Sequence, residues 1–333
     1  MLAKAAPAVP LHLLTPRIPK RAIIILMNTH LLQSHAWEQY SQLEGHQTFW
    51  LDGDGYHLLA IKHTTPLGNY LYCPYGPTLD PKHPETALEQ ALSALKNLAH
   101  EQNAFFIRIE PTFPFRAEAL AKYGLIKSHD LDPAHTWAID LTIPQDQILS
   151  GIEKRKLRHW RTHENKGITL RSTQDPEQIT ILTQFLRDLG ERDHFNPQDE
   201  NHLKNQLKSG FATLYIAEFE GKPIATALIY DYDGVRYYAH AATDEEHRKL
   251  MAGTIILIQM IIDAQNNGSK VFDFWGITTS EDPNHPWYGF TQYKKSFGGH
   301  QVDYSGTWDL PLHRFKYRLY NFLRQINRAK RKK

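Results

Sequence analysis

The sequence predicts an α/β chain, more closely an α+β chain, made of two domains that share one plan. The first observation is length, because 333 residues exceed one ordinary domain and two is the natural number. The second is that β-type segments alternate with amphipathic helical segments in the first half. The third is that the second half repeats this theme. We expect the domains at residues 29–145 and 146–310, after an N-terminal extension at 1–28.

Composition excludes several classes of protein. An apolar content of 41% with 22% charged residues is typical of a globular protein, and a net charge of +2 provides no overall field that would attract nucleic acid. The apolar run at 22–27 is far shorter than the roughly 20 residues that span a bilayer. The first 21 residues contain four prolines and no continuous apolar core, so we expect no signal peptide and a cytoplasmic protein. The single cysteine, Cys73, excludes an internal disulfide and favours a reducing compartment.

The 19 histidines do not form a zinc motif. His159 and His163 have helical spacing, but Trp160 stands where an HExxH motif needs glutamate. We therefore expect neither a metal ion nor a cofactor.

The first domain begins with a predicted hairpin, because Asp52-Gly53-Asp54-Gly55 separates two strands at 48–51 and 56–62. A strand, an amphipathic helix, an alternating strand, a short helix and a final strand follow. These segments are expected at 70–73, 85–103, 105–111, up to Tyr123, and 136–141.

The second domain is predicted to hold an amphipathic helix, three strands joined by tight turns, a buried helix and another strand. The helix at 254–267 is apolar nearly all round, so it must be buried. The other segments are expected at 179–189, 213–219, 224–230, 235–242 and 271–276.

The stretch from Val271 to His300 has the most distinctive chemistry. An aromatic strand ending at Gly276 is followed by a polar loop and then by Lys294 and Lys295, which lie among aromatic residues. A lysine held among aromatics can be partly desolvated, with its ammonium directed at a developing negative charge. The alternative is an amphipathic surface segment with solvated lysines, and spacing alone favours that alternative.

A second cationic segment runs from Ile152 to Gly167. It places five positive charges within eight residues: Lys154, Arg155, Lys156, Arg158 and Arg161. These charges predict either a solvated linker helix or a helix that contacts the phosphates of tRNA or of a nucleotide diphosphate. The last residues, Arg328 to Lys333, are a basic tail that is either solvated or in contact with anionic lipid or RNA phosphate.

Two motifs in the second domain resemble those of a known family. The segments Asp273-Phe274-Trp275-Gly276-Ile277 and Tyr293-Lys294-Lys295-Ser296-Phe297 are similar to the pair that closes the second domain of the Fem family, the peptidoglycan-bridge aminoacyltransferases, although Tyr293 replaces a phenylalanine. The LQS segment before Trp37 and the strand Phe106-Ile107-Arg108-Ile109-Glu110-Pro111 also resemble the family. The resemblance covers roughly residues 30–330.

This resemblance implies two GNAT-like acyltransferase domains in tandem, in the short form without a coiled-coil arm. It implies that the C-terminal helix at 311–333 packs back onto the first domain. We expect its apolar stripe to be buried there. The stripe consists of Phe315, Leu319, Phe322, Leu323 and Ile326.

The resemblance also implies an activity. A monomeric aminoacyltransferase would move an amino acid from aminoacyl-tRNA to the side-chain amine of the stem peptide of a nucleotide-linked or lipid-linked peptidoglycan precursor. Members that bind the nucleotide precursor carry a lysine that residues 38–42 lack.

Residue roles are carried over by motif. The expected catalytic residues are Lys294 and Tyr293. The expected substrate-binding residues are Gln33, Ser34, Trp37, Tyr75, Gly76, Arg108, Tyr237, Tyr238, Trp275 and Gly276. The expected tRNA-binding residues are Lys154, Arg155, Arg158, Arg161 and Lys295. Structural alternatives stay open: Trp37 as a core anchor, Tyr75-Gly76 as a simple turn, and Arg108 paired with Glu110.

Two other functions remain as alternatives. A GNAT-like N-acyltransferase using an acyl-CoA or carrier-protein donor would need a glycine where Met251 stands, because a side chain there would crowd the pyrophosphate. An inactive binding module is disfavoured by the retained Lys294. No Ser-His-Asp or Cys-His arrangement is discernible, so direct attack of the acceptor amine on an aminoacyl ester fits better than a covalent enzyme intermediate.

Overall fold

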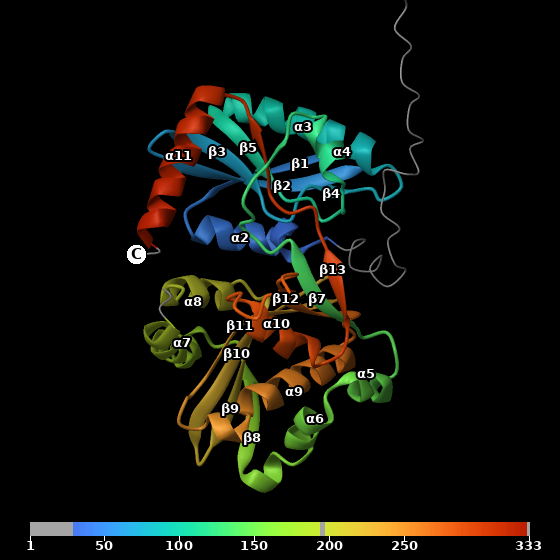
Figure 1. Ribbon diagram of the computed structural model, residues 1–333, viewed down its shortest axis with the longest axis vertical. Helices are drawn as coiled ribbons and strands as arrows, with labels where there is room; N and C mark the ends of the chain where they lie inside the picture. Colours follow the sequence, from blue (N-terminus) through green and yellow to red (C-terminus); the bar gives the residue numbers. More distant parts are fainter. Residues whose placement is uncertain (1–28, 194–196, 332–333) are drawn as a thin grey trace, which may run out of the picture. The chain divides into compact units, whose positions relative to one another are not determined.

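The computed structural model describes residues 29–193 and 197–331, with side chains except those of 193 and 327–331. The predicted extension at 1–28 lies outside the described residues. The described chain forms two compact units, one from residues 48–134 and the segment beginning at Asp303, the other from residues 29–47 and 135–302 (Figure 1). Each unit contains one mixed sheet with helices on it, which confirms the predicted α/β fold class.

The sheet of the first unit has the order β1-β2-β3-β5-β14-β6, with β4 paired to β2. The predicted hairpin is confirmed, because β1 and β2 are joined by a turn in which Gly55 has a φ of +77°. The strands are β1 (Gln47–Gly53), β2 (Tyr56–Thr65), β3 (Gly68–Cys73), β4 (Thr78–Leu79), β5 (Ala104–Ile109), β6 (Ile126–Lys127) and β14 (Trp308–Pro311). The helices are α3 (Pro84–Glu101), α4 (Ala117–Ala121) and α11 (Arg314–Arg331).

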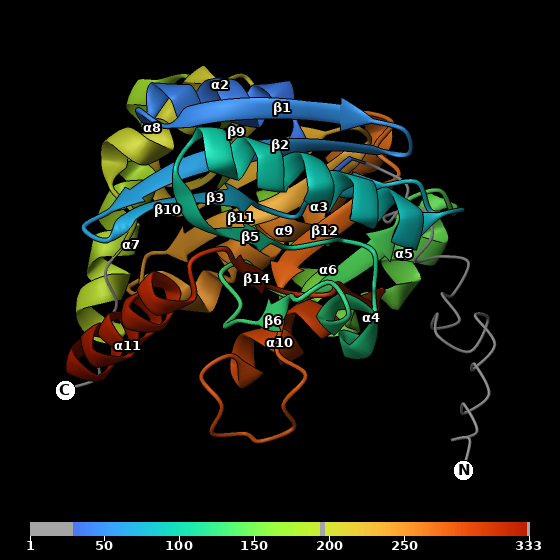
Figure 2. The same ribbon diagram turned by 90° about the horizontal axis from the view of Figure 1, so that it is seen from above.

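Helix α3 supplies most of the core of this unit. Its leucines at four- and three-residue spacing, Leu88, Leu92 and Leu95, are buried against Ile107 and Ile109 of β5. Figure 2 shows α3 lying along the strands that it covers. Strand β5 is buried on both faces, because α11 contacts the side chains that α3 leaves uncovered.

Helix α11 does return to the first unit, as predicted, but the predicted packing face is wrong. Its contacts with β5 are made by Tyr317 and Tyr320, whose rings lie 5.4 and 5.2 Å from that of Phe106. The apolar stripe expected in the core is exposed, with Phe315 at 73% and Phe322 at 60%. The reason is that Tyr317 combines ring packing with a hydroxyl that reaches buried Asp309, which the purely apolar face cannot do.

The sheet of the second unit has the order β13-β7-β12-β11-β10-β9-β8. Strands β11 and β12 pair in parallel, and β8 to β11 pair antiparallel in succession. The strands are β7 (His135–Asp140), β8 (Ile168–Thr173), β9 (Ala212–Phe219), β10 (Lys222–Tyr232), β11 (Val235–Thr243), β12 (Val271–Gly276) and β13 (His300–Asp303). The helices are α2 (His35–Leu43), α5 (Gln145–Gly151), α6 (Lys154–Arg161), α7 (Ile179–Asp193), α8 (Glu200–Lys208), α9 (Ala252–Asn266) and α10 (Tyr288–Lys295).

The predicted buried helix is confirmed as α9. Ten of its fifteen residues are buried, and they pack on the strands of the second sheet. The parallel pair β11 and β12 flanks the connection through α9, which is the usual way to join parallel neighbours. Strand β12, helix α9 and helix α10 therefore all belong to the second unit.

The predicted domain boundaries differ from the structure at three places. Strand β7, expected to complete the first domain, pairs with β12 in the second sheet. Strand β14, expected in the second domain, lies between β5 and β6 in the first sheet. Residues 29–47 also belong to the second unit. The alternating pattern of a strand identifies its buried face but not its partner, so such long-range exchanges leave no local signal.

Within the described part of the chain, α3 and α11 are the longest helices at 18 residues each, so no helical arm extends from either unit there. None of the described helices is both long and apolar enough to cross a bilayer.

Candidate functional site

Lys294 connects the end of β12 with the last turn of α10. Its Nζ donates a hydrogen bond of 2.6 Å to the carbonyl oxygen of Gly276. The same ammonium lies 5.1 Å from the ring centre of Phe290, one turn earlier on α10. The cation is therefore held between a backbone carbonyl and an aromatic face, which fits the desolvated alternative and not the solvated one that spacing alone favours. The loop that joins the two elements projects outward from the unit (Figure 2).

The end of β12 is shaped by Asp273. This buried carboxylate accepts hydrogen bonds from the Thr136 hydroxyl and, at 2.7 Å, from the backbone N–H of Trp275. Trp275 has a φ of +63°, and the pairing of β12 with β7 is irregular between Asp273 and Gly276. The carboxylate thus stabilises the strained turn that presents the Gly276 carbonyl to Lys294.

Burial changes the proton affinities of both groups. Desolvation lowers the pKa of Lys294 to about 8, although the nearby Asp273 opposes this change. Desolvation raises the pKa of Asp273 to about 6, opposed by its hydrogen bonds and by Lys294. The ammonium form of Lys294 therefore predominates at neutral pH, close to its titration range. A desolvated cation of this kind can stabilise negative charge that develops on a carbonyl oxygen.

Tyr293 points away from this lysine and into the core. Its hydroxyl lies 3.3 Å from Oγ1 of Thr254, near the start of α9, and its ring packs 5.1 Å from that of Phe297. Burial raises the pKa of Tyr293 to about 12, so its hydroxyl stays protonated. The half-buried Lys295 lies over the Trp137 ring at 5.4 Å. Of the two predicted catalytic residues, the geometry thus leaves Lys294 as the charged group, while Tyr293 packs in the core against Thr254 and Phe297.

The predicted residues of the LQS segment lie at the start of α2. Gln33 and Ser34 are buried, and Ser34 caps the helix by accepting the Trp37 N–H at 3.1 Å. The Trp37 ring packs against Tyr40 at 4.7 Å and Phe211 at 5.8 Å. These contacts fit the alternative in which Trp37 is a core anchor. Ser34 acts as the N-cap of α2.

The predicted aromatic residues gather around β11 and β12. The rings of Tyr237 and Trp275 lie 5.5 Å apart, and Tyr237 pairs with Asp273 across the parallel strands. His30, which the sequence did not single out, joins them at 4.9 Å from Tyr237. Burial lowers the pKa of His30 to about 3, so its imidazole is neutral. Tyr238 points to the opposite face and packs on Phe274.

Arg108, predicted to bind substrate, is only 1% exposed and is part of an ion pair inside the first unit. Its guanidinium donates to both carboxylate oxygens of Asp309, at 2.7 and 2.8 Å. The alternative pairing with Glu110 is wrong, because β14 brings Asp309 opposite Arg108 in the sheet. No donor of this side chain points to solvent, so the geometry supports a structural role.

Tyr75 and Gly76 form a buried turn in the first unit. Tyr75 has a φ of +47°, and its hydroxyl donates to the Pro133 carbonyl at 3.1 Å. The Gly76 carbonyl accepts the N–H of Glu110 at 2.9 Å. The turn therefore holds the end of β5, where a carboxylate cluster lies.

This cluster consists of Glu110, Asp132 and the Tyr72 hydroxyl, and sequence analysis missed it. The hydroxyl lies 2.6 Å from Glu110 and 2.7 Å from Asp132, but its single proton can serve only one carboxylate at a time. Burial, reinforced by Asp132, raises the pKa of Glu110 to about 7, and burial raises the pKa of Asp132 as well. The cluster therefore retains an extra proton at mildly acidic pH.

The four predicted tRNA-binding residues of α6 are all exposed: Lys154, Arg155, Arg158 and Arg161. In the part of the chain that the structure describes, no ion pair neutralises any of them. Lys156 differs, because it pairs with Glu153 and covers the Tyr293 ring at 5.6 Å. Helix α6 thus has one structural lysine and four cations that remain available to a ligand.

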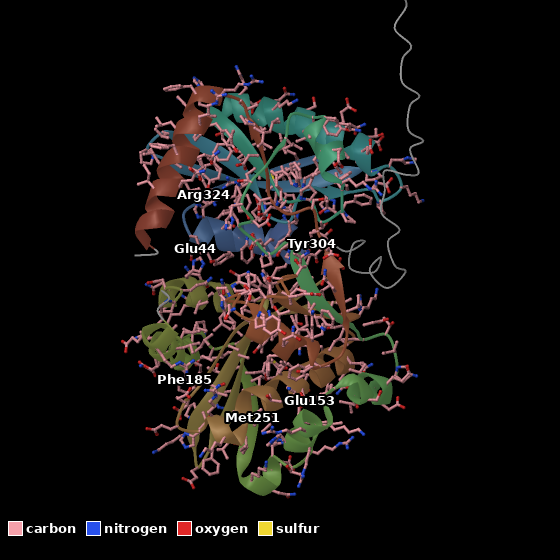
Figure 3. The ribbon with its side chains drawn as sticks, in the orientation of Figure 1. Glu44, Glu153, Phe185, Met251, Tyr304 and Arg324 are labelled. Atoms are coloured by element: carbon pink, nitrogen blue, oxygen red, sulfur yellow. The ribbon has the colours of Figure 1, made fainter. Side chains whose placement is uncertain are left out.

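The loop before α9 bears on the acyl-CoA alternative. Met251, which is labelled in Figure 3, precedes α9. It adopts a left-handed conformation, with a φ of +60°, which usually favours glycine. A Cβ on Gly253 would approach Oγ1 of Thr243 to 2.9 Å, so packing alone requires this glycine. Gly253 is therefore explained by its close approach to Thr243, without a ligand.

Among the described residues, one group has ligand atoms close enough to hold a metal ion: Asp244, Glu246 and His247. His247 already bonds to Asp244 within the group.

Comparison with known proteins gives a consistent result. Residues 204–325 match the model of the FemAB family. A lipid II:glycine glycyltransferase of Staphylococcus epidermidis is 21% identical over an alignment that covers 70% of this chain and 74% of that protein. The protein of the same name from Staphylococcus aureus is also 21% identical, over 88% of this chain and 90% of its own length.

Among solved structures, the crystal structure of FemX superimposes with a TM-score of 0.79 at 18% identity, covering 90% of this chain and 97% of FemX. The resemblance to the Fem family is therefore confirmed: residues 204–325 match the FemAB family model, and the chain has the fold of FemX.

Proposed function

We propose that this chain is an aminoacyltransferase of peptidoglycan cross-bridge formation. It transfers an amino acid from aminoacyl-tRNA to the side-chain amine of the stem peptide of a peptidoglycan precursor. The similarity to lipid II:glycine glycyltransferases supports the reaction class. The observation that carries the proposal is the desolvated ammonium of Lys294, held on the Gly276 carbonyl inside a Fem-like motif.

The reaction needs no redox partner. The neutral acceptor amine attacks the ester carbonyl, so that a C–N bond forms and the C–O bond to the tRNA ribose breaks. The amine loses one proton and the ribose oxygen gains one. Because the ester is already activated, positioning and stabilisation of the oxyanion supply most of the rate. Lys294 provides the positive charge for that oxyanion.

The donor is proposed to be tRNA-bound because of α6. Its four exposed cations, together with Lys295, are suited to the phosphates of a tRNA acceptor stem. The acceptor is a nucleotide-linked or lipid-linked muropeptide, and the protein acts as a monomer that also contacts an anionic membrane peripherally.

A reconstituted assay tests this function. Purified protein is mixed with charged tRNA pools and each precursor, and the products are analysed by mass spectrometry. We expect a precursor heavier by one amino-acid residue, only when aminoacyl-tRNA is present. Transfer from acyl-CoA instead of aminoacyl-tRNA would contradict the proposal, as would the absence of any transfer.

A further inference from the structure

Helix α11 presents an exposed apolar face that the fold of its own unit does not use. The residues of this α11 apolar face are Phe315, Leu319, Phe322, Leu323 and Ile326. All five are large, and their exposed fractions run from 36% to 73%. Isolated exposed leucines are ordinary, but five large side chains on one stripe form a patch that calls for a partner.

The opposite side of α11 holds the helix in place. The backbone N–H groups of Leu312 and His313 donate to the Phe105 carbonyl at 3.0 and 2.9 Å, which fixes the start of the helix. Buried Tyr317 bonds to Asp309 at 2.9 Å. Arg324, labelled on α11 in Figure 3, follows Tyr317 by seven residues, and this spacing puts both on one side of the helix. The α11 apolar face can therefore be changed without removing the contacts that anchor the helix.

Basic residues border this face on both sides. With about 100° between successive residues, the five apolar side chains span about 100° of the helix circumference. Exposed Lys316 lies at one edge, and exposed Arg318 and Arg314 lie beyond the other. Residues 310–333 contain nine Lys or Arg and no Asp or Glu. An apolar stripe bordered by cations is the pattern of a helix that lies in a membrane interface.

We propose that α11 binds an anionic lipid bilayer through the α11 apolar face. Phe315, Leu319 and Phe322 insert at the level between headgroups and acyl chains. Lys316, Arg314 and Arg318 extend from the edges of the stripe to the lipid phosphates. The helix lies along the surface and does not span the bilayer.

Charge complementarity favours this partner over two others. In a symmetric pair of chains joined through this face, the cationic edges of one α11 would oppose those of the other, which is unfavourable. An RNA partner would neutralise the cations but leave the apolar stripe in water. An anionic bilayer satisfies both features at once.

The evidence for this membrane contact is independent of the proposed function, but the purpose that we assign to the contact rests on that function. A membrane-bound enzyme would meet a lipid-linked acceptor at the surface where that acceptor is concentrated. The inference therefore favours the lipid-linked precursor as the acceptor in a membrane.

The direct test is co-flotation of the full chain with vesicles made of equal parts phosphatidylcholine and phosphatidylglycerol. The wild-type protein should float, and it should float less at high salt. The variant Phe315→Gln/Leu319→Gln/Phe322→Gln should lose binding on the order of 100-fold, because three apolar side chains no longer insert. The variant Arg314→Gln/Lys316→Gln/Arg318→Gln should lose at least about tenfold and most of the salt dependence.

A matched control removes the same number of exposed apolar side chains elsewhere. Leu43, Ile126 and Leu131 are 58%, 50% and 43% exposed, and their triple change to glutamine should leave flotation unchanged. All three variants should keep the wild-type melting temperature and circular dichroism. Wild-type protein that does not bind these vesicles would overturn the proposal, and so would equal loss in the control.

Two further measurements separate the alternatives. If the wild type sediments as a dimer that the apolar variant dissociates, a second copy covers this face and the proposal fails. Transfer to a lipid-linked acceptor in detergent should be unaffected by the apolar variant, while transfer in vesicles should fall at least tenfold. Wild-type protein that floats but transfers nothing in detergent would refute the proposed function alone.

Discussion

Lys294 and Gly276 are 18 residues apart in the chain and are joined by a hydrogen bond of 2.6 Å between the ammonium and the carbonyl oxygen. The carbonyl is oriented by the irregular end of β12, and the ammonium by the last turn of α10. Burial desolvates the lysine, and this contact gives its ammonium a hydrogen-bond acceptor, so a desolvated cation is available for oxyanion stabilisation.

The first prediction is that Lys294 contributes to the rate of transfer and little to binding or folding. Lys294→Met keeps the aliphatic stem and removes the charge, so transfer should fall roughly 100-fold or more, with precursor affinity within a few-fold. Single-turnover kinetics and calorimetric binding measure the two quantities. Lys295→Met, which removes the adjacent cation over Trp137, is the control and should be milder. A wild-type rate for Lys294→Met would refute the mechanism.

The second prediction concerns pH. Because burial lowers the pKa of Lys294 to about 8, the active ammonium form should be present at neutral pH and lost as pH rises through about 8. The transfer rate should fall accordingly in a pH profile. Arginine stays protonated throughout this range, so Lys294→Arg, even if slower, should show no such decline. The same decline in both proteins would assign the titration to another group.

The third prediction concerns α6. Changing Lys154, Arg155, Arg158 and Arg161 to glutamine should weaken tRNA binding and reduce the slope of log affinity against log salt by about 3. Thermal stability should hardly change, because none of the four forms an ion pair within the described residues. The control is the same change at four exposed lysines elsewhere: Lys82, Lys96, Lys208 and Lys222. Equal salt slopes for the two variants would make α6 a solvated linker.

The fourth prediction is that Arg108 stabilises the first unit and does not bind the substrate. Arg108→Ala leaves Asp309 buried and unpaired, so the free energy of unfolding should fall by about 3 to 5 kcal/mol in urea denaturation. Arg187→Ala, which breaks a partly exposed pair with Glu200, should cost no more than about 1 kcal/mol. A small loss of stability with a large loss of precursor affinity would restore Arg108 as a substrate ligand.

The fifth prediction follows from the carboxylate cluster. Burial raises the pKa of Glu110 to about 7, above its value in the unfolded chain, so the native state binds more protons between these two values. The stability contributed by the protonated group is therefore present at low pH and lost as pH rises through about 7. Melting temperatures should fall over this range in the wild type.

Glu110→Gln should reduce that slope, because the amide cannot titrate, while the buried carboxyl groups of Asp132 and Asp273 keep their own contributions. The control Glu118→Gln changes an exposed glutamate on α4 and should keep the wild-type slope. An unchanged slope in Glu110→Gln would place the titrating proton on another group.

Local patterns in the sequence were enough to place most of the helices and strands. The alternation of side chains identified strand β5. Helix α9 was predicted to be buried because it has no polar face. The turn residues before Gly55 located the first hairpin. The pairing of Lys294 with an aromatic environment was also visible, because Phe290 precedes it by one helical turn.

Tertiary structure alone decided which strands pair and which face of α11 is buried. The sequence placed β7 and β14 in the wrong units, because alternation does not encode the partner of a strand. It also selected the apolar side of α11 for the core. The core instead receives Tyr317, because the buried Asp309 that binds Arg108 has a second oxygen lone pair to satisfy, and a tyrosine hydroxyl satisfies it while a phenylalanine cannot.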